Sequence, residues 1–204
     1  MKLRNQDIGD MVIRRKVIHM ASGLLITFLI YKNIIGAREV FIFCIFGFII
    51  SMLCKRFKIP FFSWVLKMVE EPKQTMIFPG RGALFFLLGV IMVLSIRHFT
   101  LDIALASIAI LTVADPVSHL VGVQFGRIKH PLSLNKLVEG NIAGAIVGFF
   151  AAMRFVTPLE AGVASITAMI VEALEVEVNH QAIDDNLLVP LAAGTAIYLL
   201  RLYV

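Results

Sequence analysis

The chain has 204 residues, of which 59% are hydrophobic and only 16% are charged, whereas soluble domains have about 45–50% apolar and about 25% charged residues. A soluble domain of this composition would expose large apolar patches and aggregate, so the composition excludes a disordered chain, a disulfide scaffold and a secreted enzyme. The basic residues behind the net charge of +5 lie between apolar stretches. This placement favours lipid headgroups or an anionic substrate over nucleic acid. We therefore expect residues 1–204 to form a single integral-membrane domain.

Seven apolar segments follow one another along the chain and predict an all-α, polytopic membrane protein with about seven transmembrane helices. Leu, Ile, Phe, Val and Ala dominate these segments without the alternation of barrel strands, and a backbone in lipid must satisfy its own hydrogen bonds, as a helix does. The expected helices cover residues 17–35, 37–54, 82–98, 101–121, 139–156, 158–174 and 186–203.

The positive charges of the loops predict the orientation in the membrane. Alternate loops at 1–16, 55–81, 122–138 and 175–185 hold 14 of the 19 lysines and arginines, and such loops stay on the cytoplasmic side. We expect the N-terminus and these loops to be cytoplasmic and the C-terminus to lie outside. Within the second loop, residues 61–71 fit either an amphipathic interfacial helix or a plain connector with aromatic anchors.

Several ionisable side chains lie within or beside the apolar segments. Charged groups at membrane depth are costly, so they usually face a cavity or a partner and mark a functional site. All of them are expected at the cytoplasmic ends of helices or in the adjoining loops, which predicts one site open to the cytoplasm. These residues are His19, Asp115, Glu139, Glu172, Asp184 and Asp185.

Two of these groups have both a functional and a structural interpretation. Asp184 and Asp185 are suited to Mg²⁺, which prefers oxygen ligands shared with substrate phosphates, but they also precede an apolar run as a helix N-cap does. His19 shares a helix face with Arg15 and Lys16. This basic trio fits a phosphate group, while a histidine in a membrane helix also fits a packing role.

The stretch between the fourth and fifth segments combines glycines with basic and acidic residues. Gly122 and Gly126 allow close approach of a backbone, and Lys136 with Arg127 or Lys129 supplies positive charge for a polyphosphate. The alternative is a turn whose small residues serve helix packing.

This stretch resembles the nucleotide motif of the CTP-dependent lipid kinases, the group of dolichol kinase, phytol kinase and yeast-type diacylglycerol kinase, which reads D-x-x-A-x-x-x-G-x-x-x-G-x8-K-K-[ST]-x-E-G. The matching positions are Asp115, Gly122, Gly126, Lys136, Glu139 and Gly140, while Ser118, Asn135 and Leu137 depart from the motif. Further similar pieces follow the family's order along the chain: Arg15-Lys16-Val-Ile-His19, Pro79-Gly-Arg81-Gly, and Glu172 followed by Asp184-Asp185-Asn186.

The resemblance implies transfer of the γ-phosphoryl group of CTP to the hydroxyl of a membrane lipid alcohol of the polyprenol, phytol or diacylglycerol type. It implies Mg²⁺ held by Asp115, Asp184 and Asp185, and Glu139 or Glu172 as the group that orients or deprotonates the hydroxyl. The nucleotide is expected at Lys136, Arg127, Arg81, Arg15, Lys16, His19, Gly122, Gly126 and Gly140.

Two other functions remain open at this point. A cytidylyltransferase that makes a CDP-lipid would use the same carboxylates and basic residues, and its product would be pyrophosphate in place of CDP. A small transporter would place polar residues near the middle of the bilayer, whereas here they gather at one end of the helices. The oligomeric state is also open.

Overall fold

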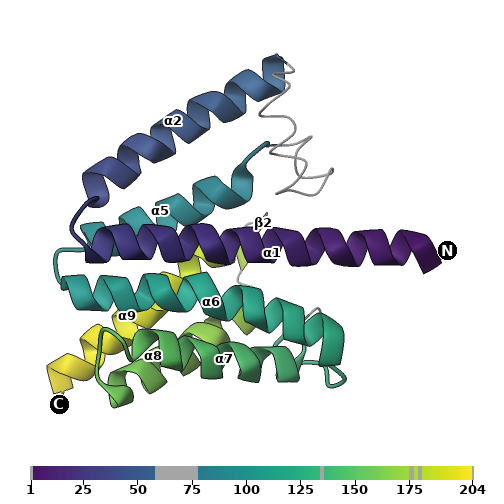
Figure 1. The fold of residues 1–204 in the computed structure, drawn as a ribbon. Helices are drawn as coiled ribbons and strands as arrows, with labels where there is room; N and C mark the ends of the chain where they lie inside the picture. Colours follow the sequence, from purple (N-terminus) through teal and green to yellow (C-terminus); the bar gives the residue numbers. More distant parts are fainter. Residues whose placement is uncertain (1, 58–77, 134–135, 175–176, 179–180, 204) are drawn as a thin grey trace.

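The computed structural model describes residues 2–57, 78–133, 136–174, 177–178 and 181–203. Within these ranges the chain is helical, apart from a pair of two-residue antiparallel strands, β1 (Glu177–Val178) and β2 (Gln181–Ala182). The described helices are α1 (Lys2–Tyr31), α2 (Ala37–Arg56), α5 (Arg81–Ser95), α6 (Leu101–Phe125), α7 (Val138–Ala152), α8 (Pro158–Ala173) and α9 (Asp185–Tyr203) (Figure 1). The all-helical prediction is confirmed. The two interpretations of residues 61–71 concern a segment outside the described residues.

Each predicted apolar segment corresponds to one described helix, and the differences lie at the ends. The helix predicted at 17–35 already begins at Lys2, and the helix predicted at 101–121 continues to Phe125. Hydropathy marks only the part of a helix that suits lipid, so a helix that continues with polar residues is longer than its apolar segment. Three described helices, α2, α6 and α9, are long and apolar enough to cross a membrane, judged by length and composition.

Helix α6 is the centre of the bundle. It contacts α1, α5, α7, α8 and α9, and its first fourteen residues are almost all buried and mostly small or aliphatic. Helix α7 approaches it closely through glycines: a Cβ added at Gly140 would lie 2.3 Å from the carbonyl oxygen of Ser118 and 3.0 Å from the Cα of Gly122. These glycines therefore set the spacing between α6 and α7.

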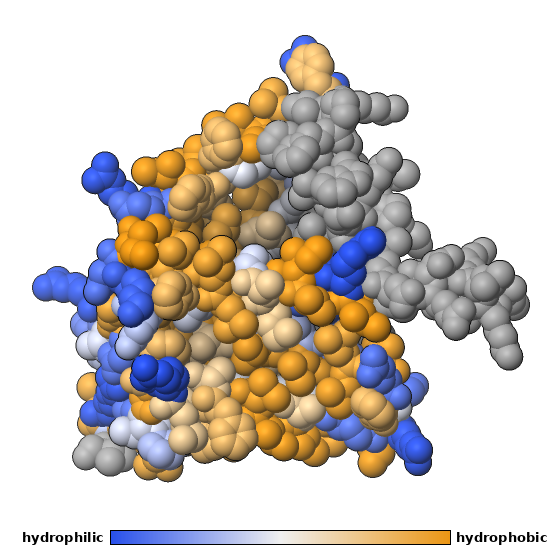
Figure 2. Space-filling model, in the orientation of Figure 1, coloured by the Kyte–Doolittle hydropathy of each residue, from blue (hydrophilic) through white to orange (hydrophobic). Residues whose placement is uncertain are grey.

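Helix α2 stands away from the bundle and packs against α5 (Figure 1). Most of its apolar side chains are exposed, among them Phe41, Phe43, Phe46 and Phe48. On the face shown in Figure 2, hydrophilic side chains gather toward the two ends and leave a mainly apolar band between them. Such a surface fits contact with lipid better than contact with water.

An ion-pair network joins three helices at the end of the bundle that holds the C-terminus. The guanidinium of Arg201 on α9 donates to Glu160 Oε1 on α8 at 2.5 Å and to Asp102 Oδ2 on α6 at 2.6 Å. Glu160 also accepts from the backbone N–H of Thr157 and so caps the start of α8. One side chain therefore connects the ends of α6, α8 and α9.

We expect Arg201→Met to lower the free energy of unfolding by about 2 kcal/mol, because it leaves the mostly buried Glu160 carboxylate without its guanidinium partner. Thermal unfolding of the purified protein in detergent measures the change. Arg97→Met, which removes an exposed arginine, is the matched control and should shift the midpoint little. An equal shift of the unfolding midpoint in both variants would show that the ion pairs of Arg201 do not stabilise the fold.

Candidate functional site

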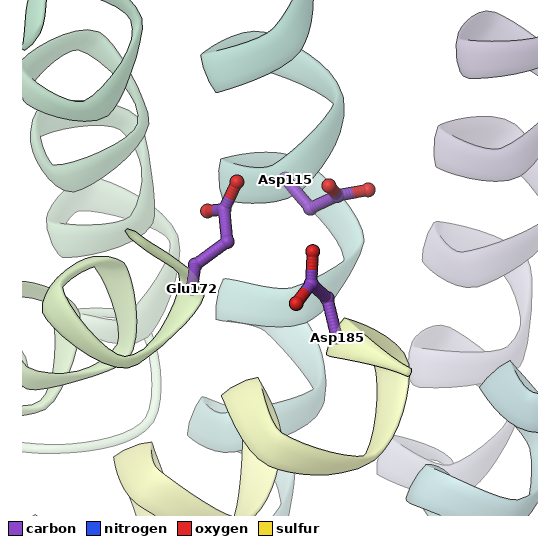
Figure 3. Close-up of side chains that lie close together, drawn as sticks. All are labelled: Asp115, Glu172 and Asp185. Atoms are coloured by element: carbon purple, nitrogen blue, oxygen red, sulfur yellow. The ribbon is translucent and has the colours of Figure 1, made fainter. Parts of the chain in front are cut away.

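Three carboxylates from three helices meet beside α6. Asp115 on α6, Glu172 on α8 and Asp185 on α9 each offer one carboxylate oxygen, and these oxygens all lie within 4.8 Å of one another (Figure 3). We call these residues the carboxylate cluster. Glu172 is the most deeply placed member, with its side chain only 3% exposed.

Lys136 connects two members of the cluster. It follows the turn after α6, and its Nζ donates to Glu172 Oε1 at 3.1 Å, to the Glu172 carbonyl oxygen at 2.6 Å and to Asp185 Oδ2 at 2.9 Å. Burial by itself lowers the pKa of Lys136, but the carboxylates of Glu172 and Asp185 outweigh burial and raise this pKa above its usual value. Lys136 is therefore held as an ammonium ion at the cluster.

A second lysine reaches the cluster from the N-terminal helix. The Nζ of Lys16 on α1 lies 2.8 Å from Asp115 Oδ2, and the two side chains are only 11% and 16% exposed. One turn further along α1, the ring of His19 packs edge-on against Phe86 with centroids 5.0 Å apart. The cluster is thus surrounded by groups from α1, α6, α8, α9 and the α6–α7 turn.

The cluster retains acceptor capacity after these contacts. Glu172 Oε2 and Asn186 Oδ1 are buried and have no hydrogen-bond partner within the part of the chain that the structure describes, and the same holds for His19 Nε2. Buried polar atoms usually have a partner. Three neighbouring carboxylates with an unsatisfied oxygen are the type of ligand set that Mg²⁺ prefers, so the residues present fit this ion.

Asp184 and Asp185 are adjacent in sequence but have different surroundings. Asp184 Oδ1 accepts from the backbone N–H of Asn186 at 3.2 Å and from its side-chain amide at 2.7 Å, so Asp184 lies at the start of α9 as a capping residue does. Asp184 Oδ2 lies 3.7 Å from Nε of Arg81. Of these two aspartates, Asp185 is the one in the carboxylate cluster, which also contains Glu172. That Asp115, Asp184 and Asp185 together hold the metal stays a prediction.

The remaining predicted residues surround the cluster or lie beyond it. Glu139 lies in the first turn of α7 and accepts from the backbone N–H groups of Arg127 and Ile128, at 2.9 Å and 3.1 Å. Its carboxylate therefore closes the α6–α7 turn and lies outside the cluster. Arg127 is exposed, and Arg15 is half-buried on α1. A Cβ at Gly126 would lie 2.4 Å from Leu137 Cδ1, so this glycine allows close contact between the end of α6 and the residue before α7. Asn135 is outside the described residues.

Two residues at the cluster were not among the predicted site residues. Ser118 donates from Oγ to Glu172 Oε1 at 3.2 Å, and Asn186 places a buried amide next to the aspartates. Ser118 lies three residues after Asp115, almost one helical turn away, and Asn186 directly follows Asp185. Their spacing from the acidic residues is the signal that could have identified them.

Comparison with known proteins gives relatives for nearly the whole chain. A CTP-dependent diacylglycerol kinase of Eremothecium gossypii is 28% identical over 162 residues, which cover 75% of this chain and 50% of the kinase. Phytol kinase 1 of Arabidopsis thaliana is 26% identical over 217 residues, covering 97% of this chain and 69% of the kinase. The chain is a relative of the CTP-dependent lipid kinases. An uncharacterised protein of Methanocaldococcus jannaschii is 28% identical over 180 residues, covering 87% of this chain and 88% of that protein.

The lipid-kinase relatives differ from this chain in length. The chain spans about half of the Eremothecium gossypii diacylglycerol kinase, and likewise about half of the Saccharomyces cerevisiae enzyme. No protein-family model and no solved structure matches the chain. The similarity to the CTP-dependent lipid kinases therefore rests on the sequence comparisons with individual kinases.

Proposed function

We propose that the chain is a CTP-dependent kinase that transfers the γ-phosphoryl group to the hydroxyl of a membrane lipid alcohol. The observation that carries the proposal is the carboxylate cluster with its two lysines, assembled from segments that are distant in sequence, in a chain related to lipid kinases. Phosphoryl transfer depends mainly on positioning and on neutralising the charge of the phosphates. Acidic residues for a metal and ammonium groups for phosphates are what that chemistry needs.

Asp115 and Asp185 would hold Mg²⁺, with Glu172 beside them. When bound, the ion would supply positive charge to the phosphate oxygens of the nucleotide. Lys136 and Lys16 would then turn from the carboxylates toward the phosphates, because both ammonium groups already lie at the cluster. Arg81, which lies 3.7 Å from Asp184, and Arg127 of the α6–α7 turn would contact the outer part of the nucleotide.

Glu172 is the group that we propose to accept the proton of the lipid hydroxyl. Its Oε2 is buried without a partner in the described part of the chain, while its Oε1 is held by Ser118 and Lys136. In the transfer, the lipid oxygen bonds to the γ-phosphorus, the bond from this phosphorus to the β,γ-bridging oxygen breaks, and CDP leaves. The proton of the hydroxyl goes to Glu172 Oε2.

We further propose that the chain is a single polytopic membrane domain with its N-terminus and the site on the cytoplasmic side, where the nucleotide is found. Two observations support this arrangement. Figure 1 shows the N-terminus and the α6–α7 turn at one end of the bundle, opposite the C-terminus, and the loops expected at that end carry most of the positive charge.

A product assay tests the proposed function. Protein purified in detergent receives CTP labelled in its γ-phosphate, Mg²⁺ and, in separate reactions, geranylgeraniol, phytol, a polyprenol or diacylglycerol. We expect label in the lipid fraction, with CDP as the second product. Label released as pyrophosphate only when phosphatidic acid is supplied would contradict the kinase and indicate a cytidylyltransferase.

A further inference from the structure

A groove of about 640 Å³ runs along the outer surface between α8 and α9. Two parallel rows of side chains form it. The row on α8 follows helical spacing through Val163, Thr167 and Val171, and the row on α9 runs from Leu188 to Tyr203. The lining is mainly aliphatic, so water would be a poor occupant and a hydrocarbon a good one.

One end of this groove is lined by residues that lie close to the cluster residues along the chain. Val171 directly precedes Glu172, and Leu188 lies three residues after Asp185, less than one helical turn away. The helices that supply two of the three carboxylates therefore also supply both walls of the groove.

The length of the groove suits a lipid tail. From Leu188 to Tyr203 the α9 wall advances by about 22 Å at 1.5 Å per residue, and half of a bilayer core is about 15 Å thick. A chain that starts at the cluster and follows α9 would reach beyond the middle of the bilayer.

We propose that the groove between α8 and α9 binds one hydrocarbon tail of the acceptor lipid and thereby places its hydroxyl at Glu172. This inference rests on the proposed lipid kinase function and names the path by which the acceptor enters. It also predicts specificity for tail length. The kcat/KM for the acceptor should rise with each added methylene group until the groove is filled, because each methylene group that enters the groove adds apolar contact.

Two variants that fill the groove test the proposal. Ala192→Phe and Ala196→Phe each add a ring to the α9 wall. Ile166→Phe is the matched control, because Ile166 is an exposed residue of α8 outside the groove lining. We expect the groove variants to lower kcat/KM for geranylgeraniol about tenfold, the loss of roughly two methylene contacts, while kcat/KM for a short prenol and the KM for CTP stay at the wild-type values.

The outcomes separate this proposal from the proposed function. If wild-type protein phosphorylates geranylgeraniol and the groove variants behave as Ile166→Phe does, the groove proposal is wrong and the kinase remains. If wild-type protein phosphorylates no lipid alcohol, the kinase is wrong.

A second measurement does not depend on turnover. A geranylgeraniol analogue with a diazirine in its tail is photolysed with the protein in phosphatidylcholine vesicles. We expect labelling of α8 and α9 that unlabelled geranylgeraniol suppresses. Labelling that is spread evenly over α2, α7 and α9 and is not suppressed would show bulk lipid in the groove and overturn the proposal.

Discussion

Asp185→Asn is expected to lower the rate of phosphoryl transfer about a thousandfold or more, while the neighbouring Asp184→Asn lowers it by less than about fivefold. Asp185 lies within the carboxylate cluster, and loss of one negative charge there would weaken the proposed binding of Mg²⁺. Asp184 instead directly precedes α9 and accepts from the backbone N–H of Asn186, and asparagine caps a helix about as well as aspartate. Its contact with the half-exposed Arg81 is long and contributes little.

This pair of variants changes the same atoms at adjacent positions, so each is the control for the other. Initial rates are measured over a range of Mg²⁺ concentrations, and the thermal midpoints in detergent confirm that both variants fold. We expect a higher Mg²⁺ requirement for Asp185→Asn only. The reverse order of activities would assign the metal to Asp184 and would show that the cluster has a structural role.

Lys136→Met is expected to lower kcat/KM for CTP about a hundredfold or more, because it removes an ammonium group from the place where the phosphates are proposed to bind. It should also destabilise the fold by about 3 kcal/mol, since it leaves the buried Glu172 without its charged partner. Lys129→Met, which changes an exposed lysine of the same turn, should change both quantities little.

A double variant separates the two effects of Lys136. Lys136→Met combined with Glu172→Gln removes both charges of the buried pair, so most of the lost stability should return while activity stays low. Thermal unfolding and initial rates of the two single variants and the double variant give the comparison. If activity returned together with stability, Lys136 would be a structural residue only.

The positions of the helices could be predicted from hydropathy, whereas the partners of the site residues could not. Every apolar segment is a helix in the structure, because a long apolar run leaves the backbone few alternatives. Lys16 and Asp115 are 99 residues apart, and no local pattern indicates that they form an ion pair. Such a contact depends on how α1 packs on α6.

The partners of the acidic residues also could not be predicted, even for two aspartates that are adjacent in sequence. Adjacent residues at the start of a helix point in directions about 100° apart, so Asp184 and Asp185 face different neighbours, and the packing of α9 decides which of them meets Asp115. Glu172 could be recognised as costly at membrane depth. Its place in the cluster follows from the contacts of α8 and α9, which the sequence does not display.

The ion pair between Lys16 and Asp115 has a consequence for how the chain enters the membrane. Asp115 lies within α6, ten residues before its end. In the proposed membrane domain, an unpaired aspartate there adds to the free energy of insertion, by up to about 2.5–3.5 kcal/mol, the value for the centre of a membrane helix. Its partner Lys16 is synthesised first and precedes the apolar part of α1. The free energy of inserting α6 into lipid is therefore lowest when α1 is already in place and Lys16 can pair with Asp115. The N-terminal helix thus assists the insertion of the helix that carries Asp115.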